Sequence, residues 1–413
     1  MHICRKWRRL VFSYQQSLQL RLFCTHGTPV KNTLGCWPRA LPIVVEYGGS
    51  PGLDPPTPED ENEIMAALKR HDRVQSISLT ITSSLLEKLS AIKKPFSKLE
   101  DLILLSRDDV RLTLPRAFRW GRRLRRLHST RIVILALVQL HYSSIDLQLH
   151  EVPNPWHYSP KALPNALFRM AQLRSLSLYF LPTSENAAVS PPSRNRVVFP
   201  VLTRLEYRGI TSDLEDLVAR IDAPRLEDIE ITFSDESITN LFKLVGFIDR
   251  IEIHKSHRQA HILSSENAIS ISLTQSEAPT RIKFQSFHES FSSQLFSMTR
   301  ILTPFSSFLL DVEDLHVNVL RQSRQEDSSY TGRWLEFLNL FGGVPTLHSL
   351  YIPQPGPRHV FLREAVASFM ALRRLFGHPV AVEYEQLSQM SELSGAGTKR
   401  TQCRRHCLLT RFR

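Results

Sequence analysis

Glycine is scarce in this sequence, with 15 glycines among 413 residues, under 4% against about 7% in average proteins. Folds that hold phosphates or dinucleotides with backbone amides depend on glycine-rich turns. The sequence contains no P-loop, no GxGxxG turn and no H-E-x-x-H motif. These absences argue against a nucleotide-dependent enzyme and against a zinc protease, and we expect no bound cofactor.

Cysteine is also rare, and the body of the chain has none. The five cysteines are Cys4, Cys24, Cys36, Cys403 and Cys407. An odd number gathered at the two ends does not form a disulfide framework, so we expect a reducing compartment, the cytoplasm and/or the nucleus. Cys403, His406 and Cys407 lack the second pair of ligands that a structural zinc site needs, so we expect no metal.

Long apolar runs are missing. The longest, Ile132–Val138, has seven residues, whereas a membrane-spanning helix needs about 18 or more.

Acidic residues are absent from both ends of the chain, residues 1–45 and 393–413. These two segments hold 13 of the 52 Lys and Arg residues, so 39 basic and 40 acidic residues remain between them. A balanced body argues against specific nucleic-acid binding. The Arg-rich, acid-free start leaves a mitochondrial transit peptide open as a less favoured alternative.

One short phrase, L-x-x-L-x-L, recurs along the chain. Its eleven copies begin at Val74, Leu99, Leu124, Ser144, Leu173, Leu202, Leu226, Ile248, Ala268, Val312 and Leu347. Eight of the ten spacings fall within 20–29 residues, the period of leucine-rich repeats. Alternation at the end of each phrase points apolar side chains to one face of a strand, and units this small bury that face only by stacking.

Helical patterns lie between the strand motifs, at Glu59–Lys69, Leu85–Ile92, Leu214–Ile221 and Glu364–Phe376. Strand and helix therefore alternate within each period. We predict an α/β fold, an irregular leucine-rich-repeat-like open solenoid with a curved parallel sheet, helices outside and a short helical N-terminal stub. The spacings of 44 and 35 predict insertions or lost units near the C-terminal end.

Gly48–Gly52 matches the G-x-S-x-G outline of a hydrolase nucleophile elbow around Ser50. The oxyanion hole needs the backbone N–H of the residue after the serine, and Pro51 has none. We therefore expect a turn and no catalytic residue. The acidic pairs Glu100-Asp101, Glu227-Asp228 and Glu313-Asp314 recur at one repeat position and predict a solvated face instead of an acid/base pair.

Arginines cluster between Arg111 and Arg131, and no acidic residue lies between Asp109 and Asp146. Arginine groups can bind phosphate or carboxylate in a bidentate manner. The candidate anionic docking patch consists of Arg119, Trp120, Arg122, Arg123, Arg125 and Arg126. The alternative is a solvated basic loop whose charges meet acidic residues of neighbouring repeats.

The segment Ile3-Cys-Arg-Lys-Trp7-Arg-Arg-Leu10 resembles the last helix of an F-box, and with the repeats behind it the chain resembles the F-box/leucine-rich-repeat proteins expanded in mushroom-forming fungi. The resemblance implies that Cys4, Trp7 and Leu10 pack the F-box against a Skp-type adaptor of a cullin ubiquitin ligase. The front F-box helices, which open with a Leu-Pro motif, are missing before the Trp motif.

The expected organisation has three parts: a residual F-box helix over residues 1–16, a solenoid over 17–355, and a terminal helix with a basic tail over 356–413. The expected function is non-catalytic protein binding, with an unknown protein substrate recruited for ubiquitination by a monomer within a complex. The alternative is a stand-alone repeat interaction module without a ligase link.

Overall fold

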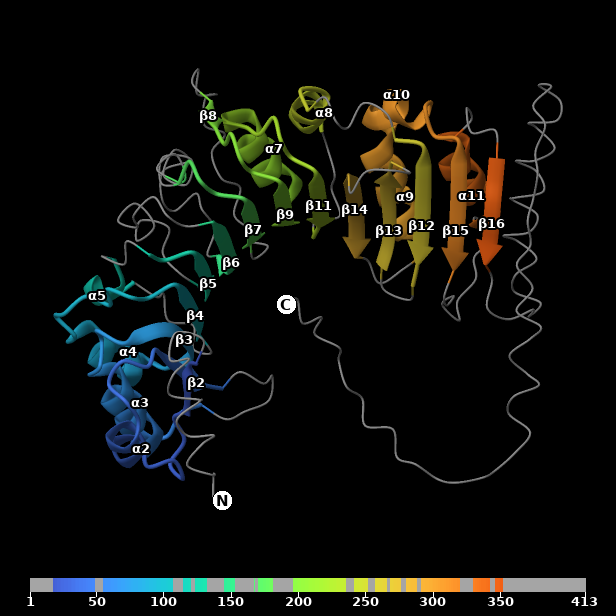
Figure 1. The fold of residues 1–413 in the computed structure, drawn as a ribbon. Coiled ribbons are helices and arrows are strands. Elements are labelled where there is room, and N and C mark those ends of the chain that lie inside the picture. Colours follow the sequence, from blue (N-terminus) through green and yellow to red (C-terminus); the bar gives the residue numbers. More distant parts are fainter. Residues whose placement is uncertain are drawn as a thin grey trace, which may run out of the picture.

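The computed structural model describes residues 18–48, 55–106, 114–119, 123–131, 145–152, 167, 170–180, 196–234, 241–251, 257–265, 268–275, 280–287, 291–319, 330–341 and 346–351. Within these segments the chain forms strands that stand side by side along an arc, with helices along one side of it (Figure 1). The fold is α/β with a large, mostly parallel sheet whose two edge strands do not meet.

Fourteen strands make up the main sheet. In chain order they are β1 Leu20–Phe23, β2 Ile43–Tyr47, β3 Val74–Ile81, β4 Asp101–Ser106, β5 Arg126–Thr130, β6 Asp146–Val152, β7 Ser175–Phe180, β9 Arg204–Gly209, β11 Asp228–Phe233, β12 Gln259–Ser264, β13 Ala268–Thr274, β14 Arg281–Phe287, β15 Asp314–Val319 and β16 Thr346–Tyr351. A second, two-stranded sheet pairs β8 Val197–Val198 with β10 Ile221–Asp222.

Helices connect many of these strands, as parallel pairing requires. They are α2 Val30–Cys36, α3 Pro58–Leu68, α4 Ser83–Ser90, α5 Arg116–Arg119, α7 Thr211–Arg220, α8 Phe242–Asp249, α9 Phe291–Leu302, η5 Thr303–Phe305, α10 Ser306–Leu309 and α11 Tyr330–Asn339. Local sequence fixes several starts: Thr57 and Asp60 form a capping box at α3, with proline at the first helical position. Thr82 caps α4 by accepting from the backbone N–H of Leu85.

The strand order follows the chain except at one place. The order across the sheet is β1-β2-β3-β4-β5-β6-β7-β9-β11-β14-β13-β12-β15-β16. After β11 the chain goes to β12, returns through antiparallel β13, and places β14 parallel to β11. The chain then resumes with β15 parallel to β12. Strand β13 is the reversed strand among those described.

Apolar side chains at alternate strand positions form one continuous core with the helices. Each central strand contributes two or three fully buried residues, such as Leu102 and Leu104 of β4 or Ile229 and Ile231 of β11. Burying one such side chain stabilises the fold by about 1.5–3 kcal/mol. Aromatic residues fill the wider layer behind the C-terminal strands, with the Phe284 and Phe305 rings 5.0 Å apart. The core therefore lies between the sheet and its helices.

Nine of the eleven recurrent motifs coincide with parallel strands, from β3 to β7 and then β9, β11, β15 and β16. The predicted helices Glu59–Lys69, Leu85–Ile92 and Leu214–Ile221 are confirmed as α3, α4 and α7, to within a few residues. The predicted helix Glu364–Phe376 lies outside the described residues.

One predicted repeat strand is wrong, and a second is a strand but not a parallel one. The motif that begins at Ile248 falls on the end of helix α8, because Phe242–Asp249 buries Leu244, Phe247 and Ile248 on one helical face. The motif that begins at Ala268 is a strand, β13, but it runs antiparallel to both neighbours. Strands β1, β2, β12 and β14 carry no L-x-x-L-x-L phrase and were not predicted as repeats.

The main sheet begins at Leu20 and ends at Tyr351. Both ends fall inside the segment 17–355 that the sequence assigns to the repeat region. The segments 1–16 and 356–413, expected to hold the F-box remnant and the basic tail, lie outside the described residues.

Candidate binding surface

The face of the sheet opposite the helices is built from the strand positions that alternate with the core. We call this surface the open face. Parallel registers align one residue per strand across it, in rows. The first row reads Ser76, Asp101, Arg126, Asp146, Ser175, Arg204, Asp228 and Arg281. Because strands lie about 4.8 Å apart, neighbours in a row are within reach of side-chain contact.

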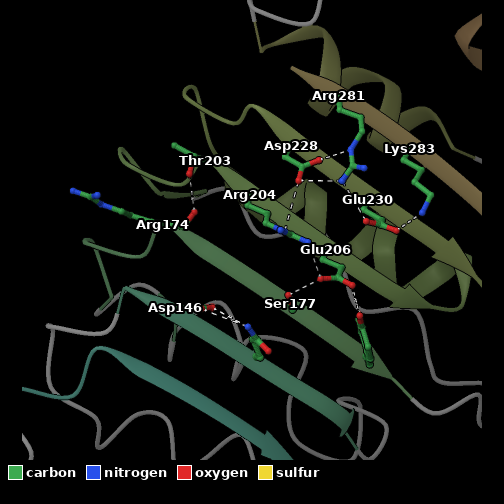
Figure 2. Close-up of polar contacts among 12 residues, drawn as sticks. Asp146, Arg174, Ser177, Thr203, Arg204, Glu206, Asp228, Glu230, Arg281 and Lys283 are labelled. Carbon is green, nitrogen blue, oxygen red and sulfur yellow. Dashed lines mark hydrogen bonds and ion pairs between the residues drawn. The ribbon is translucent and has the colours of Figure 1, made fainter. Parts of the chain in front are cut away.

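Acidic and basic residues alternate along this row and pair across strands. Arg126 donates from Nε and Nη2 to the two carboxylate oxygens of Asp101, at 2.6 and 2.7 Å. Arg281 donates from Nε and Nη2 to the two carboxylate oxygens of Asp228 in the same way, at 3.0 and 3.2 Å (Figure 2). Hydrogen bonding to Asp101 raises the pKa of Arg126, and Asp228 does the same for Arg281. Both guanidinium groups therefore stay charged and fixed in orientation.

A second row lies one pleat further along the strands, and in it Glu206 is next to Glu230, which is next to Lys283. Glu206 lies 3.6 Å from Arg204, and Glu230 lies 2.6 Å from Nζ of Lys283. Figure 2 shows these side chains projecting from β9, β11 and β14 to one side of the sheet. Exposed ion pairs each contribute only about 0–1 kcal/mol to stability. The rows therefore matter less for holding the fold than for fixing a defined charge pattern on its surface.

Aromatic and imidazole rings stack across β5, β6 and β7. The His128 and His150 rings lie 4.5 Å apart, and those of His150 and Tyr179 lie 4.0 Å apart, nearly parallel. The Tyr179 hydroxyl donates to Glu206, which also accepts from Ser177 at 3.0 Å. Burial lowers the pKa of His150 to about 4, and burial with the Glu206 hydrogen bond raises the pKa of Tyr179. These groups are neutral near pH 7.

A hollow of about 230 Å³ opens beside this stack. Its walls come from four consecutive parallel strands, β3 to β6. The lining residues are Ser76, Asp101, Ile103, Arg126, Leu127, His128, Asp146 and Gln148. The hollow thus combines two carboxylates, one guanidinium that Asp101 already neutralises, an imidazole and an aliphatic wall.

No protein-family model matches the chain, and no curated protein matches it. The F-box likeness therefore rests on the residues quoted for it in the sequence. Those residues, Cys4, Trp7 and Leu10, lie outside the described part of the chain.

The predicted arginine patch is divided by the structure. Arg123 and Arg125 are exposed in the turn before β5. Arg126 lies on the open face, where its guanidinium is paired with Asp101. Arg119 ends α5, and its side chain, like Trp120 and Arg122, lies outside the described residues. The alternative that arginines meet acids of neighbouring repeats therefore holds for Arg126.

The recurrent acidic pairs occupy one structural position. Asp101, Asp228 and Asp314 are the first residues of β4, β11 and β15, on the open face. Ser50 and the Cys403–Cys407 segment lie outside the described residues. Among the side chains that are described, no group of three or more His, Cys, Asp or Glu is placed to hold a metal ion. None of the described helices is long and apolar enough to cross a membrane.

Sequence reasoning missed the ring stack and a second histidine pair. His261 of β12 and His316 of β15 stack at 4.5 Å with their planes 9° apart. His128 is the second open-face residue of predicted strand β5, and His150 is the third of predicted strand β6. The alternation of side chains along each strand could therefore have placed both histidines on the open face. The stacking of His261 on His316 depends on β12 lying beside β15, which the reversed order of the chain there conceals.

Proposed function

We propose that this chain is a non-catalytic protein-binding scaffold, an irregular leucine-rich-repeat-like open solenoid whose open face docks a protein partner. The observation that carries the proposal is the row of cross-strand charges from Asp101 to Arg281, held in place by bidentate pairing. A rigid surface with a fixed charge pattern favours one partner and disfavours others, because like charges placed opposite each other cost several kcal/mol.

Regular repetition supports the solenoid part of the proposal. Seven motifs, from Val74 to Leu226, recur every 20–29 residues and coincide with strands β3 to β7, β9 and β11, which pair in chain order. Each of these strands adds apolar residues to one shared core. Units of this kind contact mainly their neighbours, so curvature builds an extended surface instead of a closed pocket. Such surfaces are suited to macromolecular partners.

The F-box likeness supports a more specific role, the substrate-recognition subunit of a Skp–cullin–F-box ubiquitin ligase. In that role the N-terminal segment holds the adaptor and the open face holds the substrate. The second candidate is a stand-alone interaction module without a ligase link.

The experiment tests the two parts separately. Partner capture from cell extract is quantified for the full chain and for variants that place a bulky cation on the open face, Ser78→Arg and Ser272→Arg. Ser78 pairs with Ile103 across β3 and β4, and Ser272 pairs with Lys283 across β13 and β14. Ser307→Arg serves as the matched control, because Ser307 is exposed on α10, on the helix side. We expect the face variants to lose specific partners that the control retains.

Recombinant Skp-type adaptor is then mixed with the same proteins and the complex is measured by size-exclusion chromatography. Adaptor binding that survives the face variants supports the ligase role. If the adaptor does not bind but face-dependent partners persist, the chain is a stand-alone module. If the face variants retain every partner, the open face is not the docking surface.

A further inference from the structure

Among the described residues, the charge row on the open face has one acidic member without a paired cation, Asp146. Arg126 lies between Asp101 and Asp146 but directs Nε and Nη2 to Asp101. On the other side, β7 places Ser175 next to Asp146 where a basic residue would continue the alternation. By contrast, Asp228 is flanked by two arginines, Arg204 at 3.7 Å and Arg281 at 3.0 Å.

The contacts of Asp146 are weak. Among the described residues its carboxylate accepts only from Gln148 Nε2, at 3.4 and 3.5 Å. Charge-assisted hydrogen bonds of nitrogen to carboxylate are normally about 2.7–2.9 Å. The carboxylate therefore retains most of its capacity to accept hydrogen bonds, and it lines the hollow between β3 and β6.

The charges around the hollow sum to a net −1. Two carboxylates, Asp101 and Asp146, face one guanidinium, Arg126. His128 contributes no charge near pH 7, because burial lowers its pKa, and its buried Nε2 has no hydrogen-bond partner within the part of the chain that the structure describes. A cation is therefore the ion that this hollow is built to accept.

The size of the hollow limits what that cation can be. Its volume of about 230 Å³ is room for roughly seven water molecules at ~30 Å³ each. Small-molecule and cofactor pockets usually measure about 300–1,000 Å³. The hollow is thus suited to a single long side chain.

We propose that this hollow binds an arginine side chain of the protein partner. The inference rests on the proposed function and adds the chemistry of one anchor residue. A guanidinium can pair with Asp146 in a bidentate manner, as Arg126 does with Asp101. Its plane can lie on the His128 ring, and its methylene groups can contact Ile103. A lysine ammonium group is a point charge, so it would stack less well on the His128 ring than a guanidinium and could not bind both carboxylate oxygens of Asp146 in parallel.

The probe for this site is N-acetylarginine amide, with N-acetylcitrulline amide as its neutral isostere. Binding is followed by the Ile103 δ-methyl NMR signal of the full chain, labelled at isoleucine methyl groups. We expect saturable shifts with the arginine probe and none with the citrulline probe. Asp146→Asn should weaken binding at least about tenfold, because it removes the unpaired charge. Asp311→Asn, an equal change of charge at an exposed turn, should leave binding unchanged.

A second variant guards against a folding defect in the first. Gln148→Glu adds a carboxylate beside Asp146 and should tighten binding of the arginine probe several-fold. Equal shifts with citrulline, unchanged binding by Asp146→Asn, or no gain from Gln148→Glu would each overturn the assignment. Partner capture that still depends on Ser78 and Ser272 in that case would leave the docking function standing and remove only the arginine anchor.

Discussion

Lys88 of α4 donates a 2.7 Å hydrogen bond from Nζ to the carboxylate of Glu61 in α3, so that a buried acid joins two consecutive helices. The Glu61 side chain is only 4% exposed. It also accepts from the hydroxyls of Thr82 and Ser84, at 2.8 and 2.9 Å, at the start of α4. The contact therefore connects one structural unit to the next through the helix layer.

Glu61→Ala should loosen this junction. Three donors would lose their acceptor, and we expect a cost of about 2–4 kcal/mol, lower than for a fully enclosed pair because Lys88 is partly exposed. Hydrogen exchange of the α3 and α4 amides measures the loss. Lys88→Met should cost less, about 1 kcal/mol, because the two hydroxyl contacts remain. Equal exchange rates in wild type and Glu61→Ala would contradict this account.

Acid should weaken the same junction. Burial raises the pKa of Glu61, but hydrogen bonds from Lys88, Thr82 and Ser84 outweigh it and hold the pKa below its ordinary value. A lowered carboxyl pKa contributes stability above the unfolded value of about 4.3, and that stability is lost as pH falls through the folded pKa. Exchange in α4 should therefore rise below about pH 4 in the wild type and respond much less in Glu61→Gln.

Glu215 of α7 should show the opposite dependence on pH. Its carboxylate caps α8 by accepting from the backbone N–H groups of Lys243 and Leu244, at 2.9 and 2.8 Å. Burial nevertheless raises its pKa. A raised carboxyl pKa means that stability falls as pH rises from the unfolded value toward the folded one. Glu215→Ala should cost about 1–2 kcal/mol as a lost cap, measured by exchange in α8. Glu215→Gln should remove the pH dependence while keeping one acceptor.

Protonation of His150 should destabilise the ring stack on the open face. Its pKa is lowered from 6.5 to about 4, chiefly by burial, and the charges of His128 and Arg208 lower it further while Glu151 opposes them. The neutral form is therefore favoured on folding, and stability is lost as pH falls from about 6.5 toward 4. Thermal unfolding at a series of pH values should show this decline, and His150→Phe, which keeps a ring against Tyr179, should reduce it. An NMR titration that places the His150 pKa near 6.5 would refute the prediction.

The arginines at the start of β5 should separate into two classes. Arg123 and Arg125 are exposed, so changing both to Glu should alter stability by less than about 0.5 kcal/mol and weaken retention of the chain on an immobilised polyglutamate peptide. Arg126→Ala should instead cost about 1 kcal/mol by releasing Asp101, with little loss of retention. Unchanged retention of the double variant would contradict a role for Arg123 and Arg125 in the anionic docking patch.

The sequence predicts those parts of the fold in which strands that follow one another in the chain are also neighbours in the sheet. The leucine phrases that lead into β4, β7 and β11 are strands because alternation buries two residues per strand, and each pairs with the strand of the preceding unit. The order of strands in the β12–β14 region could not be predicted in this way. Arg281–Phe287 shows the alternation of a strand, but motif spacing does not reveal that this strand pairs with β11 and β13.

The candidate site was predicted less completely than the fold. The recurrent Glu-Asp pairs indicate a solvated face, and Asp101 and Asp228 lie there. Which basic residue each one meets depends on the register between strands that are 25 or 53 residues apart in the chain, as for Arg126 with Asp101 and Arg281 with Asp228. Asp146 was not singled out, because the role that we propose for it depends on its having no such partner among the described residues.

The displaced position of β12 also governs the order in which the molecule can assemble. Units up to β11 can add one after another, since each strand of the main sheet pairs with the main-sheet strand made before it. Strand β12 has no place beside β11, and the gap between them fills only when β13 and β14 have been added. The chain from β11 to β14 must therefore close as one cooperative block, and this non-local step should be slower than the stepwise growth before it.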